Sequence, residues 1–345
     1  MAETRFQDLS PADRRDALEV AEQSGSYRAH LLEKDIWVVA ALGTLFETPF
    51  GQDLIFKGGT SLSKVYGAIR RFSEDVDITY DIRAFARDLV SGTGDEALPP
   101  SRSQENRWTQ TIRARLTKWV QDTACPSVAE GLAAAGFAAQ VHPCKERLYI
   151  CYETLFDDSS FVRPQVMVEF GARSTGEPRW QRPVVCDAAA CLPRLVFPDA
   201  RPTAMRAERT FWEKATAIHV FCRQERYRFE RLSRHWHDLV RLDEVGIAAN
   251  ALNDHKLALS VARHKSKFFS EKDACGVWIS YKAAVSGGLQ LVPSGATYEV
   301  LADDYARMLD SGMLLDESES FNVLMERCAL IQARANRTDG AMETA

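Results

Sequence analysis

The sequence feature that most constrains this chain is a pair of neighbouring segments, residues 56–64 and 71–78. The first segment reads Phe-Lys-Gly-Gly-Thr-Ser-Leu-Ser-Lys and continues an apolar run that begins at residue 54. This order predicts a buried strand, a double-glycine turn, and a helix that begins at Thr60 or Ser61. A glycine turn at a helix start exposes backbone amides where the helix dipole favours an anion. The first segment therefore predicts a cradle for phosphate.

The second segment places two acids two residues apart, Asp75 and Asp77, in a pattern typical of a strand. Alternation along the strand sends both carboxylates to one face, and Val76 and Ile78 to the other. Two adjacent carboxylates repel each other unless a divalent cation lies between them and the substrate. Together the two segments predict a site for a metal-bound nucleoside triphosphate. The alternative is a tight turn followed by two surface acids on an edge strand.

Composition excludes several classes of protein. The chain has 345 residues, of which 46% are hydrophobic, enough for one large or two ordinary domains. It has no apolar run long enough to span a bilayer and no hydrophobic signal core at its N-terminus, so we expect a cytoplasmic protein without a membrane partner. The formal net charge of −5 argues against a protein that coats nucleic acid, but it allows a local basic groove. The eight scattered cysteines form no Cys-x-x-Cys pair and are expected to be reduced thiols.

Hydrophobic periodicity predicts an α/β half followed by a helical half. Helical spacing is found at 10–24, 28–46, 107–123 and 128–135, with Ser10 as the first cap. Strand patterns are found at 54–56, 75–80, 137–141, 148–152 and 165–170, the last three as a meander. After a proline-containing segment with little periodicity at 187–203, helices are expected at 207–223, 233–245, 250–268, 296–311 and 320–336. The predicted fold class is α/β (α+β), with a core and its N-terminal helices at 1–195, a helical domain at 205–336 and a flexible tail at 337–345.

Two single residues outside the first segments are candidates for chemistry. Glu169 ends an apolar strand and could be a third metal carboxylate, or it could pair with Arg173. Lys214 lies beside the apolar face of the 207–223 helix, from which its amine could neutralise triphosphate charge. An ordinary solvated lysine has the same spacing, so the pattern alone does not decide.

Basic and aromatic residues gather in two further places. Arg223, Arg226, Arg228, Arg231 and Arg234 interleave with aromatic residues and could hold an RNA backbone, although the glutamates among them also fit a solvated loop. His235 and Asp238 share a helix face and could bind a metal, while Asp238 could instead act in catalysis or orient a lysine. The run 264–269 could contact RNA or phosphate, or could simply end a helix with cations near its last carbonyls.

These segments, in this order, resemble the AbiEii/MenT-type nucleotidyltransferase toxins, which belong to the DNA polymerase β-like superfamily. The resemblance covers most of the chain, from about residue 30 to 330, and its most specific part is residues 58–77. It lies in the segments 58–66, 71–77, 169–173, 210–215, 233–239, 264–269 and 304–308. It implies a polymerase β-like nucleotidyltransferase core that is followed by a helical C-terminal domain.

The resemblance also implies roles for individual residues. Asp75 and Asp77 match the metal-binding acids, Lys214 the essential lysine and Asp238 the essential aspartate of the family, and Glu169 is a weaker candidate for the metal. The residues expected to bind the nucleotide are Gly58, Gly59, Ser61, Lys64 and Ser73. Those expected to bind RNA are Arg226, Arg228, Arg231 and Arg234.

The function implied is transfer of a nucleoside monophosphate from an NTP, with Mg²⁺ or Mn²⁺, to the 3′ acceptor end of tRNA or another RNA. Such transfer blocks translation, and the family usually acts in a toxin–antitoxin or phage-defence pair, so an antitoxin protein is an expected partner. One alternative is the same chemistry on a hydroxyl of a protein, either an antitoxin or a host target, or of a small molecule. Another is a nucleotide-sensing module without turnover, against which the intact Asp75, Asp77 and Lys214 count.

Overall fold

The protein divides into two compact units. The structure, a computed structural model, describes residues 4–25, 27–156, 163–225, 230–310, 313–315 and 319–337. By its contacts, the first unit comprises residues 1–67, 72–92 and 106–205, and the second comprises 68–71, 93–105 and 206–345. The predicted division is contiguous in sequence, whereas two short segments, 68–71 and 93–105, group by contact with the C-terminal part of the chain.

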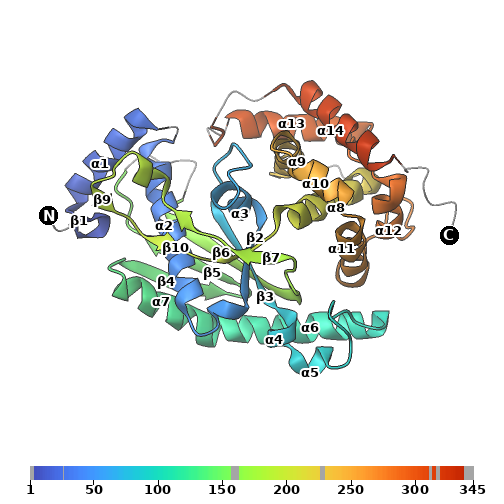
Figure 1. Cartoon of the computed structure of the whole chain (residues 1–345), viewed down its shortest axis with the longest axis horizontal. Coiled ribbons are helices and arrows are strands. Elements are labelled where there is room, and N and C mark those ends of the chain that lie inside the picture. Colours follow the sequence, from blue (N-terminus) through green and yellow to red (C-terminus); the bar gives the residue numbers. More distant parts are fainter. Residues whose placement is uncertain are drawn as a thin grey trace. The chain divides into compact units, whose positions relative to one another are not determined.

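Within the described residues, a seven-stranded mixed sheet forms the centre of the first unit (Figure 1). Its strand order is β4-β5-β6-β3-β2-β11-β7. The central strands are β2 (Leu54–Lys57), antiparallel to β3 (Asp75–Asp81), and β6 (Gln165–Ser174), parallel to β3. One edge is the predicted antiparallel meander of β4 (Ala139–Cys144), β5 (Arg147–Tyr152) and β6, and the other holds β11 (Thr203–Met205) and β7 (Arg179–Gln181). The mixed α/β fold class is confirmed.

The sheet has one apolar and one polar face, as the alternation in the sequence predicts. Val76 and Ile78 of β3 are fully buried on the apolar face, whereas Asp75 and Asp77 are only partly buried on the other. Helices α2 (Ala29–Glu47), α6 (Arg102–Trp119) and α7 (Cys125–Ala134) belong to the apolar side. Trp119 of α6 packs edge-on against Phe170, and Trp37 of α2 stacks on the ring of Tyr152.

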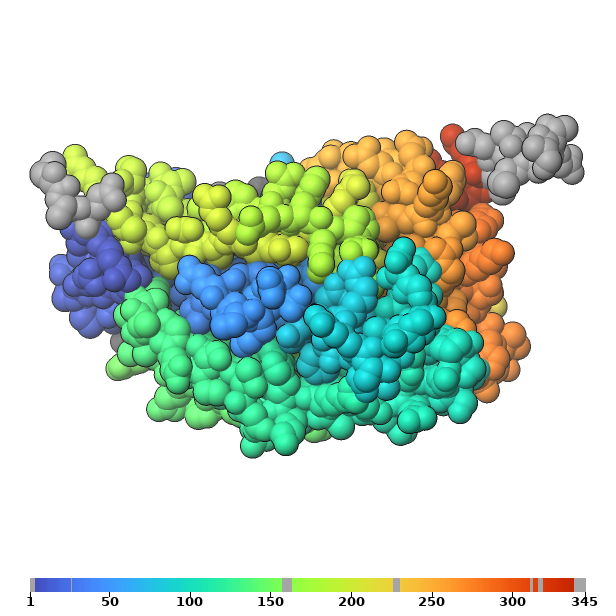
Figure 2. Space-filling view, turned by 60° about the horizontal axis from the view of Figure 1, so that its bottom comes forward, coloured from blue at the N-terminus to red at the C-terminus, as the bar shows by residue number. Residues whose placement is uncertain are grey.

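Helices α2 and α7 pack closely against each other. A Cβ on Gly131 of α7 would overlap the side chain of Thr44 of α2, so only glycine lets the two helices approach this far. Figure 2 shows α7, in green, beside the end of α2, in blue. A π-helical turn, residues 120–124, joins α6 to α7. These closely packed helices cover the apolar face of the sheet. The acids of β3, Asp75 and Asp77, lie on the opposite face.

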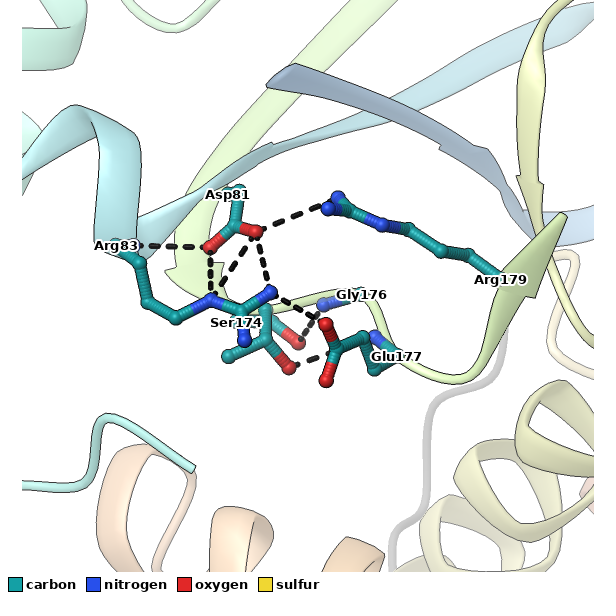
Figure 3. Close-up of polar contacts among 7 residues, drawn as sticks. Asp81, Arg83, Ser174, Gly176, Glu177 and Arg179 are labelled. Atoms are coloured by element: carbon teal, nitrogen blue, oxygen red, sulfur yellow. Dashed lines mark hydrogen bonds and ion pairs between the residues drawn. The ribbon is translucent and has the colours of Figure 1, made fainter. Parts of the chain in front are cut away.

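The far end of β3 is fixed by an ion-pair cluster (Figure 3). Asp81 is buried, caps α4 (Ile82–Phe85) by accepting from the backbone N–H of Arg83, and lies 2.7 Å from the Arg83 guanidinium. Arg179 of β7 lies 3.3 Å from the same carboxylate, and Arg83 also contacts Glu177. The cluster therefore holds β3, α4 and the turn before β7 together.

The remaining elements of the first unit are short, except for α1 (Pro11–Ser24), which begins at the predicted Ser10 cap. α3 (Gly58–Lys64) follows β2, and α4 is followed by α5 (Arg87–Val90). Residues 187–203, where we expected little periodicity, form short pieces, and all of them except Thr203, the first residue of β11, lie outside the main sheet. β1 (Thr4–Arg5) pairs with β9 (Leu195–Val196), and β8 (Val184–Val185) pairs with β10 (Asp199–Ala200).

The described part of the second unit is helical. Its helices are α8 (Ala207–Gln224), α9 (Arg234–Glu244), α10 (Ile247–Asn253), α11 (His255–Phe268), α12 (Tyr281–Ala283), α13 (Ala296–Asp310) and α14 (Phe321–Ala335). α8 packs against α9, α10 and α11. Trp212 of α8 is buried, and its indole N–H donates to the carbonyl of Ala251. The single helix expected at 250–268 is wrong, because Asp254 leaves the helical conformation and caps α11 through the backbone N–H of Leu257.

Two general properties complete the fold. All eight cysteines are free thiols. In the described ranges, no helix is both long and apolar enough to cross a membrane. The predicted flexible tail at 337–345 lies outside the described residues except for Arg337.

Candidate functional site

Gly58 and Asp77 lie directly against each other in the first unit. α3 begins at Gly58 and not at Thr60 or Ser61 as predicted, because Gly58 has φ +78°, a left-handed conformation that glycine adopts without strain. A Cβ at this position would overlap Oδ2 of Asp77, so the turn can come this close to the carboxylate only as glycine. No side chain caps the first turn of α3. The structure thus joins the two halves of the sequence motif, the glycine turn and the Asp-x-Asp strand, in one place.

Thr60 fastens α3 to the start of β3. Its hydroxyl is fully buried, donates to the carbonyl of Asp75 at 2.6 Å, and lies 3.0 Å from the Ser73 hydroxyl. The sequence pattern indicates Ser73 as a nucleotide-binding residue but assigns no such role to Thr60. The neighbouring Ser61 is 1% exposed, and its hydroxyl has no hydrogen-bond partner in the described part of the chain. A buried hydroxyl without a partner is rare, and a bound phosphate oxygen would satisfy it.

The polar face of the sheet carries a row of charges across four strands. Direct pairing places Lys57 of β2 beside Asp77, Asp77 beside Glu169 of β6, and Glu169 beside Arg147 of β5. The order of charges is therefore positive, negative, negative, positive. Glu169 lies 2.7 Å from Arg147, an ion pair that the sequence did not indicate, since Arg173 was the partner considered there. The role of Glu169 as a metal ligand stays a prediction.

The acids fit a divalent cation that is shared with a substrate. Asp75 and Asp77 supply carboxylate oxygens, the ligands that Mg²⁺ prefers, and Mg²⁺ is commonly held by one or two carboxylates together with substrate phosphates. Among the described residues, no group of three or more His, Cys, Asp or Glu side chains is close enough to hold a metal alone. The two carboxylates therefore fit a Mg²⁺ ion that a bound triphosphate would also coordinate.

Lys64, predicted to bind the nucleotide, ends α3 in a buried ion-pair cluster. Its amine lies 2.6 Å from Asp35 of α2 and 2.7 Å from Asp187. Burial lowers the pKa of Lys64, but the two carboxylates outweigh it and raise the pKa above its usual range. Burial also raises the pKa of Asp35 to about 6. In this structure Lys64 anchors α3 to α2, and a contact with the nucleotide stays a prediction.

In the second unit, Asp238 is enclosed between two cations. Its carboxylate accepts from Arg71 in bidentate fashion, at 2.7 Å and 2.8 Å, and lies 2.9 Å from the amine of Lys214. Burial raises the pKa of Asp238, but the charges of Arg71 and Lys214 outweigh it and hold the pKa well below its usual range. Asp238 therefore stays ionised and is a weak base. Asp238 and Lys214 were predicted site residues, whereas Arg71 is a third member of this cluster that the sequence does not indicate.

The histidines beside Asp238 are part of the packing. His237 is 1% exposed, and within the described residues neither of its ring nitrogens has a hydrogen-bond partner. Burial lowers the pKa of His237 to about 4, so its ring is neutral at pH 7. Asp238 is engaged by Arg71 and Lys214, so the metal site that His235 and Asp238 could have formed has no support here.

Asp304 fixes the start of the helix that carries Asp238. Its two carboxylate oxygens accept from the backbone N–H groups of Arg231 and Ser233, each at 2.8 Å. Of the four predicted RNA-binding arginines, Arg231 and Arg234 lie at this helix start, and Arg234 donates to the carbonyl of Arg231. Arg226 and Arg228 lie outside the described residues. Asp304 stood in the segment 304–308 of the sequence resemblance, but its contact could not be foreseen.

Comparison with known proteins identifies the family. Residues 40–327 match the model of a family described as nucleotidyl transferase AbiEii toxin, type IV toxin–antitoxin system. Among solved structures, the chain is similar to MenT4, a nucleotidyltransferase toxin from Mycobacterium tuberculosis H37Rv. The two share 15% sequence identity over 96% of this chain and 91% of that chain, with a TM-score of 0.47. No curated protein matches the chain. The family match spans most of the chain and confirms the predicted family and enzyme class: this protein belongs to the AbiEii family of nucleotidyltransferase toxins.

Proposed function

We propose that this toxin transfers a nucleoside monophosphate from an NTP to the 3′ hydroxyl of an RNA, with the acceptor end of tRNA as the first candidate. The main support for the proposal is the contact between Gly58 and Asp77. It joins a glycine segment suited to binding phosphate to a carboxylate suited to binding a metal ion. The family match supports nucleotidyl transfer as the reaction. The blocked acceptor end would stop translation, which gives a toxin its effect.

The reaction is an in-line displacement at the α-phosphorus of the NTP. The oxygen of the RNA 3′ hydroxyl forms a bond to this phosphorus, the bond from the phosphorus to the oxygen bridging the β-phosphate breaks, and pyrophosphate leaves. The proton of the hydroxyl passes to a carboxylate of the Asp75–Asp77 pair. The turn at Gly58 and Gly59 and the buried Ser61 hydroxyl hold phosphate oxygens, and Thr60 keeps this turn at the start of β3.

Asp75 and Asp77 would hold Mg²⁺ or Mn²⁺. When bound, the ion neutralises triphosphate charge and lowers the pKa of the acceptor hydroxyl. Glu169 is a further candidate ligand, but its ion pair with Arg147 supplies a structural role that needs no metal.

We assign to Lys214 the role of neutralising the negative charge that develops on the leaving pyrophosphate. Asp238 is assigned the role of holding Lys214 in position. The distance of 2.9 Å between them supports the positioning role. The lowered pKa of Asp238 argues against the alternative that it deprotonates the acceptor, because a carboxylate between two cations takes up a proton poorly. Arg231 and Arg234, with Arg226 and Arg228, are assigned to the RNA. A cognate antitoxin protein is part of the proposal, since the family is described as a toxin–antitoxin system.

The experiment is labelling of RNA in vitro. Purified protein, Mg²⁺ and each α-labelled NTP in turn are incubated with total tRNA, and the 3′ ends are sequenced. We expect one or more NTPs to label RNA at its 3′ terminus, and Asp75→Ala to abolish the label. Label on protein or on a small molecule, with none on RNA, would assign the chemistry to another acceptor. Tight NTP binding without pyrophosphate release would replace the proposal with a nucleotide-sensing module.

A further inference from the structure

Three large apolar side chains lie exposed within one short segment that follows α11. Phe269 is 38% exposed, Val277 61% and Trp278 47%. Soluble proteins seldom gather large apolar groups at the surface unless a partner covers them. Phe269, Trp278 and the cations beside them, Arg102, Lys265 and Lys272, are called here the Trp278 patch. All of these residues belong to the second unit.

A well-bonded turn holds Trp278 in its exposed position. Oδ1 of Asp273 accepts from the backbone N–H of Cys275 at 3.0 Å and of Val277 at 2.9 Å. Lys272 and Trp278 pair across the turn as a β-bridge. At the other end of the segment, the hydroxyl of Tyr281 donates to the carbonyl of Phe269 at 2.6 Å. The exposure of the rings is therefore built into the fold.

Each ring of the patch carries a cation. The guanidinium carbon of Arg102 lies 3.6 Å from the centroid of the Trp278 ring, and the amine of Lys272 lies 4.8 Å from it. The amine of Lys265 lies 4.9 Å from the centroid of the Phe269 ring. These are cation–π distances, so the cations stand over aromatic surface. Such a concentration of positive charge stands out in a chain with a net charge of −5.

The acids near the patch have partners of their own. Asp273 receives the backbone donors of its turn and lies 2.9 Å from Arg223. Glu271 accepts from the side-chain amide of Gln224, and the buried Glu105 lies near the hydroxyl of Ser270. Asp273 is thus already paired with a cation, and Arg102 and Lys272 place positive charge against the exposed Trp278 ring, which favours an anionic partner.

We propose that the Trp278 patch binds single-stranded RNA, with bases stacked on its aromatic and guanidinium surfaces and phosphates held by Lys265 and Lys272. The inference rests on the proposed function, and it names the surface that holds the acceptor RNA. Stacking on aromatic rings that alternate with cations is the mode by which proteins hold single strands. An acidic protein partner would form ion pairs with the cations. It would not supply planar groups to stack on the rings of Phe269 and Trp278, as RNA bases do.

The test is RNA binding by the full chain, measured by fluorescence anisotropy. The two probes are a fluorescein-labelled RNA stem with a short single-stranded 3′ end and the same stem with a blunt end. We expect Trp278→Ala to raise Kd for the single-stranded probe about 10-fold and Trp278→Phe to restore most of the affinity. Lys272→Ala is expected to reduce the slope of log Kd plotted against log salt concentration by about 1. The control Leu330→Ala, at another exposed apolar position, should bind as the wild type does.

Separate outcomes overturn the inference and the proposed function. If the wild type labels RNA and both Trp278→Ala and Lys272→Ala bind RNA normally, the patch is not the RNA surface. Equal weakening for both probes would exclude single-stranded recognition. If the wild type neither binds nor labels any RNA, the proposed function itself fails. Affinity for the NTP alone should be the same in every variant, which separates the patch from the nucleotide site.

Discussion

The aspartates of the two units have opposite surroundings. Asp77 is partly buried on the polar face of a sheet, with Gly58 against its carboxylate, Lys57 beside it on β2, and the carboxylates of Asp75 and Glu169 at neighbouring positions. Asp238 is fully buried and is held by Arg71 and Lys214. Neighbouring carboxylates on one face repel each other, whereas a carboxylate enclosed by two cations is stabilised.

From this difference we propose that Asp75 and Asp77 bind a ligand, whereas Asp238 also stabilises the fold of its unit. Because Asp75 and Asp77 are proposed to bind a cation that arrives with the substrate, their removal should cost more activity than stability. Asp238 already has its cations, so its removal should cost stability as well. β3 itself carries both kinds of carboxylate. Asp81 at its far end forms ion pairs with Arg83 and Arg179 and is structural, unlike Asp75 and Asp77 (Figure 3).

The largest effect is expected at Asp77. Asp77→Asn should lower the rate of nucleotidyl transfer by about 10³-fold, because a proposed ligand of the metal ion is lost. Its melting temperature should stay near that of the wild type, because the lost attraction to Lys57 is offset by the relieved repulsion from Asp75 and Glu169. Labelled transfer and thermal unfolding measure the two quantities.

Asp81→Asn is the matched control on the same strand. It should keep transfer within about 10-fold of the wild type, and it should lose about 1–3 kcal/mol of stability because Arg83 and Arg179 lose their charged partner. The comparison breaks if Asp77→Asn destabilises the protein as much as Asp81→Asn does.

Asp238→Asn should cost both stability and activity. Arg71 and Lys214 would be left as buried cations without a carboxylate, which typically costs about 3–5 kcal/mol. Urea unfolding measures the loss. Asp243→Asn is the control on the same helix, since its exposed pair with Arg334 should contribute about 1 kcal/mol or less. Equal stability of the two variants would show that Asp238 is not the structural centre of its unit.

Gly58→Ala tests the contact between the turn and Asp77. The left-handed backbone alone should cost about 1–2 kcal/mol. The added Cβ also pushes the Asp77 carboxylate aside, and such a displacement can slow transfer by about 10²-fold. Gly246→Ala is the control. Gly246 has the same left-handed backbone, with φ +79°, but a Cβ added there would meet no atom of the described residues within 4 Å. Normal transfer by Gly58→Ala would refute the importance of this contact.

The pH dependence of stability should reveal the buried histidine beside Asp238. The pKa of His237 is about 4 in the folded state and 6.5 in its reference state, so the unfolded chain binds more protons between these values. Stability from this group is complete above pH 6.5 and is lost as the pH falls towards 4, by an amount on the order of 3 kcal/mol. His237→Leu should flatten that part of the curve, as urea unfolding across the range would measure. An unchanged slope in the variant would contradict the assignment.

The smallest effect is expected at Glu169. As the partner of Arg147 in a half-exposed ion pair, Glu169 should contribute about 1 kcal/mol or less to stability. If this pair is its whole role, Glu169→Gln should keep transfer within a few fold of the wild type, with an unchanged Mg²⁺ requirement. A loss comparable to that of Asp77→Asn would instead identify Glu169 as a third metal ligand.

Local patterns in the sequence predicted the parts of this structure that depend on neighbouring residues. The alternation at 75–78 predicted which side chains β3 buries, and Ser10 predicted the start of α1. The pattern at 250–268 predicts one helix, whereas the structure has two. Asp254 lies within a regular apolar repeat, so from the sequence it resembles a polar residue on a helix surface and not a helix cap.

Contacts between distant residues could not be predicted in this way. Asp238 and Arg71 are 167 residues apart, so no spacing rule indicates their ion pair. Lys64 looks like a nucleotide ligand from its place after the glycine turn, and only the fold shows that Asp35 and Asp187 hold its amine. The overlap of Gly58 with Asp77 likewise depends on the pairing of β2 with β3, which the motif suggests but does not specify.

The most direct test of the central claim is the intact mass of a synthetic RNA after reaction with the protein, Mg²⁺ and NTP. We predict that an RNA with a free 3′ hydroxyl gains the mass of one or more nucleoside monophosphate residues, with one pyrophosphate released per residue. The same RNA with a blocked 3′ end should gain nothing, and neither should any RNA with the Asp77→Asn variant. An equal gain on the blocked RNA, or a gain that survives Asp77→Asn, would contradict the account.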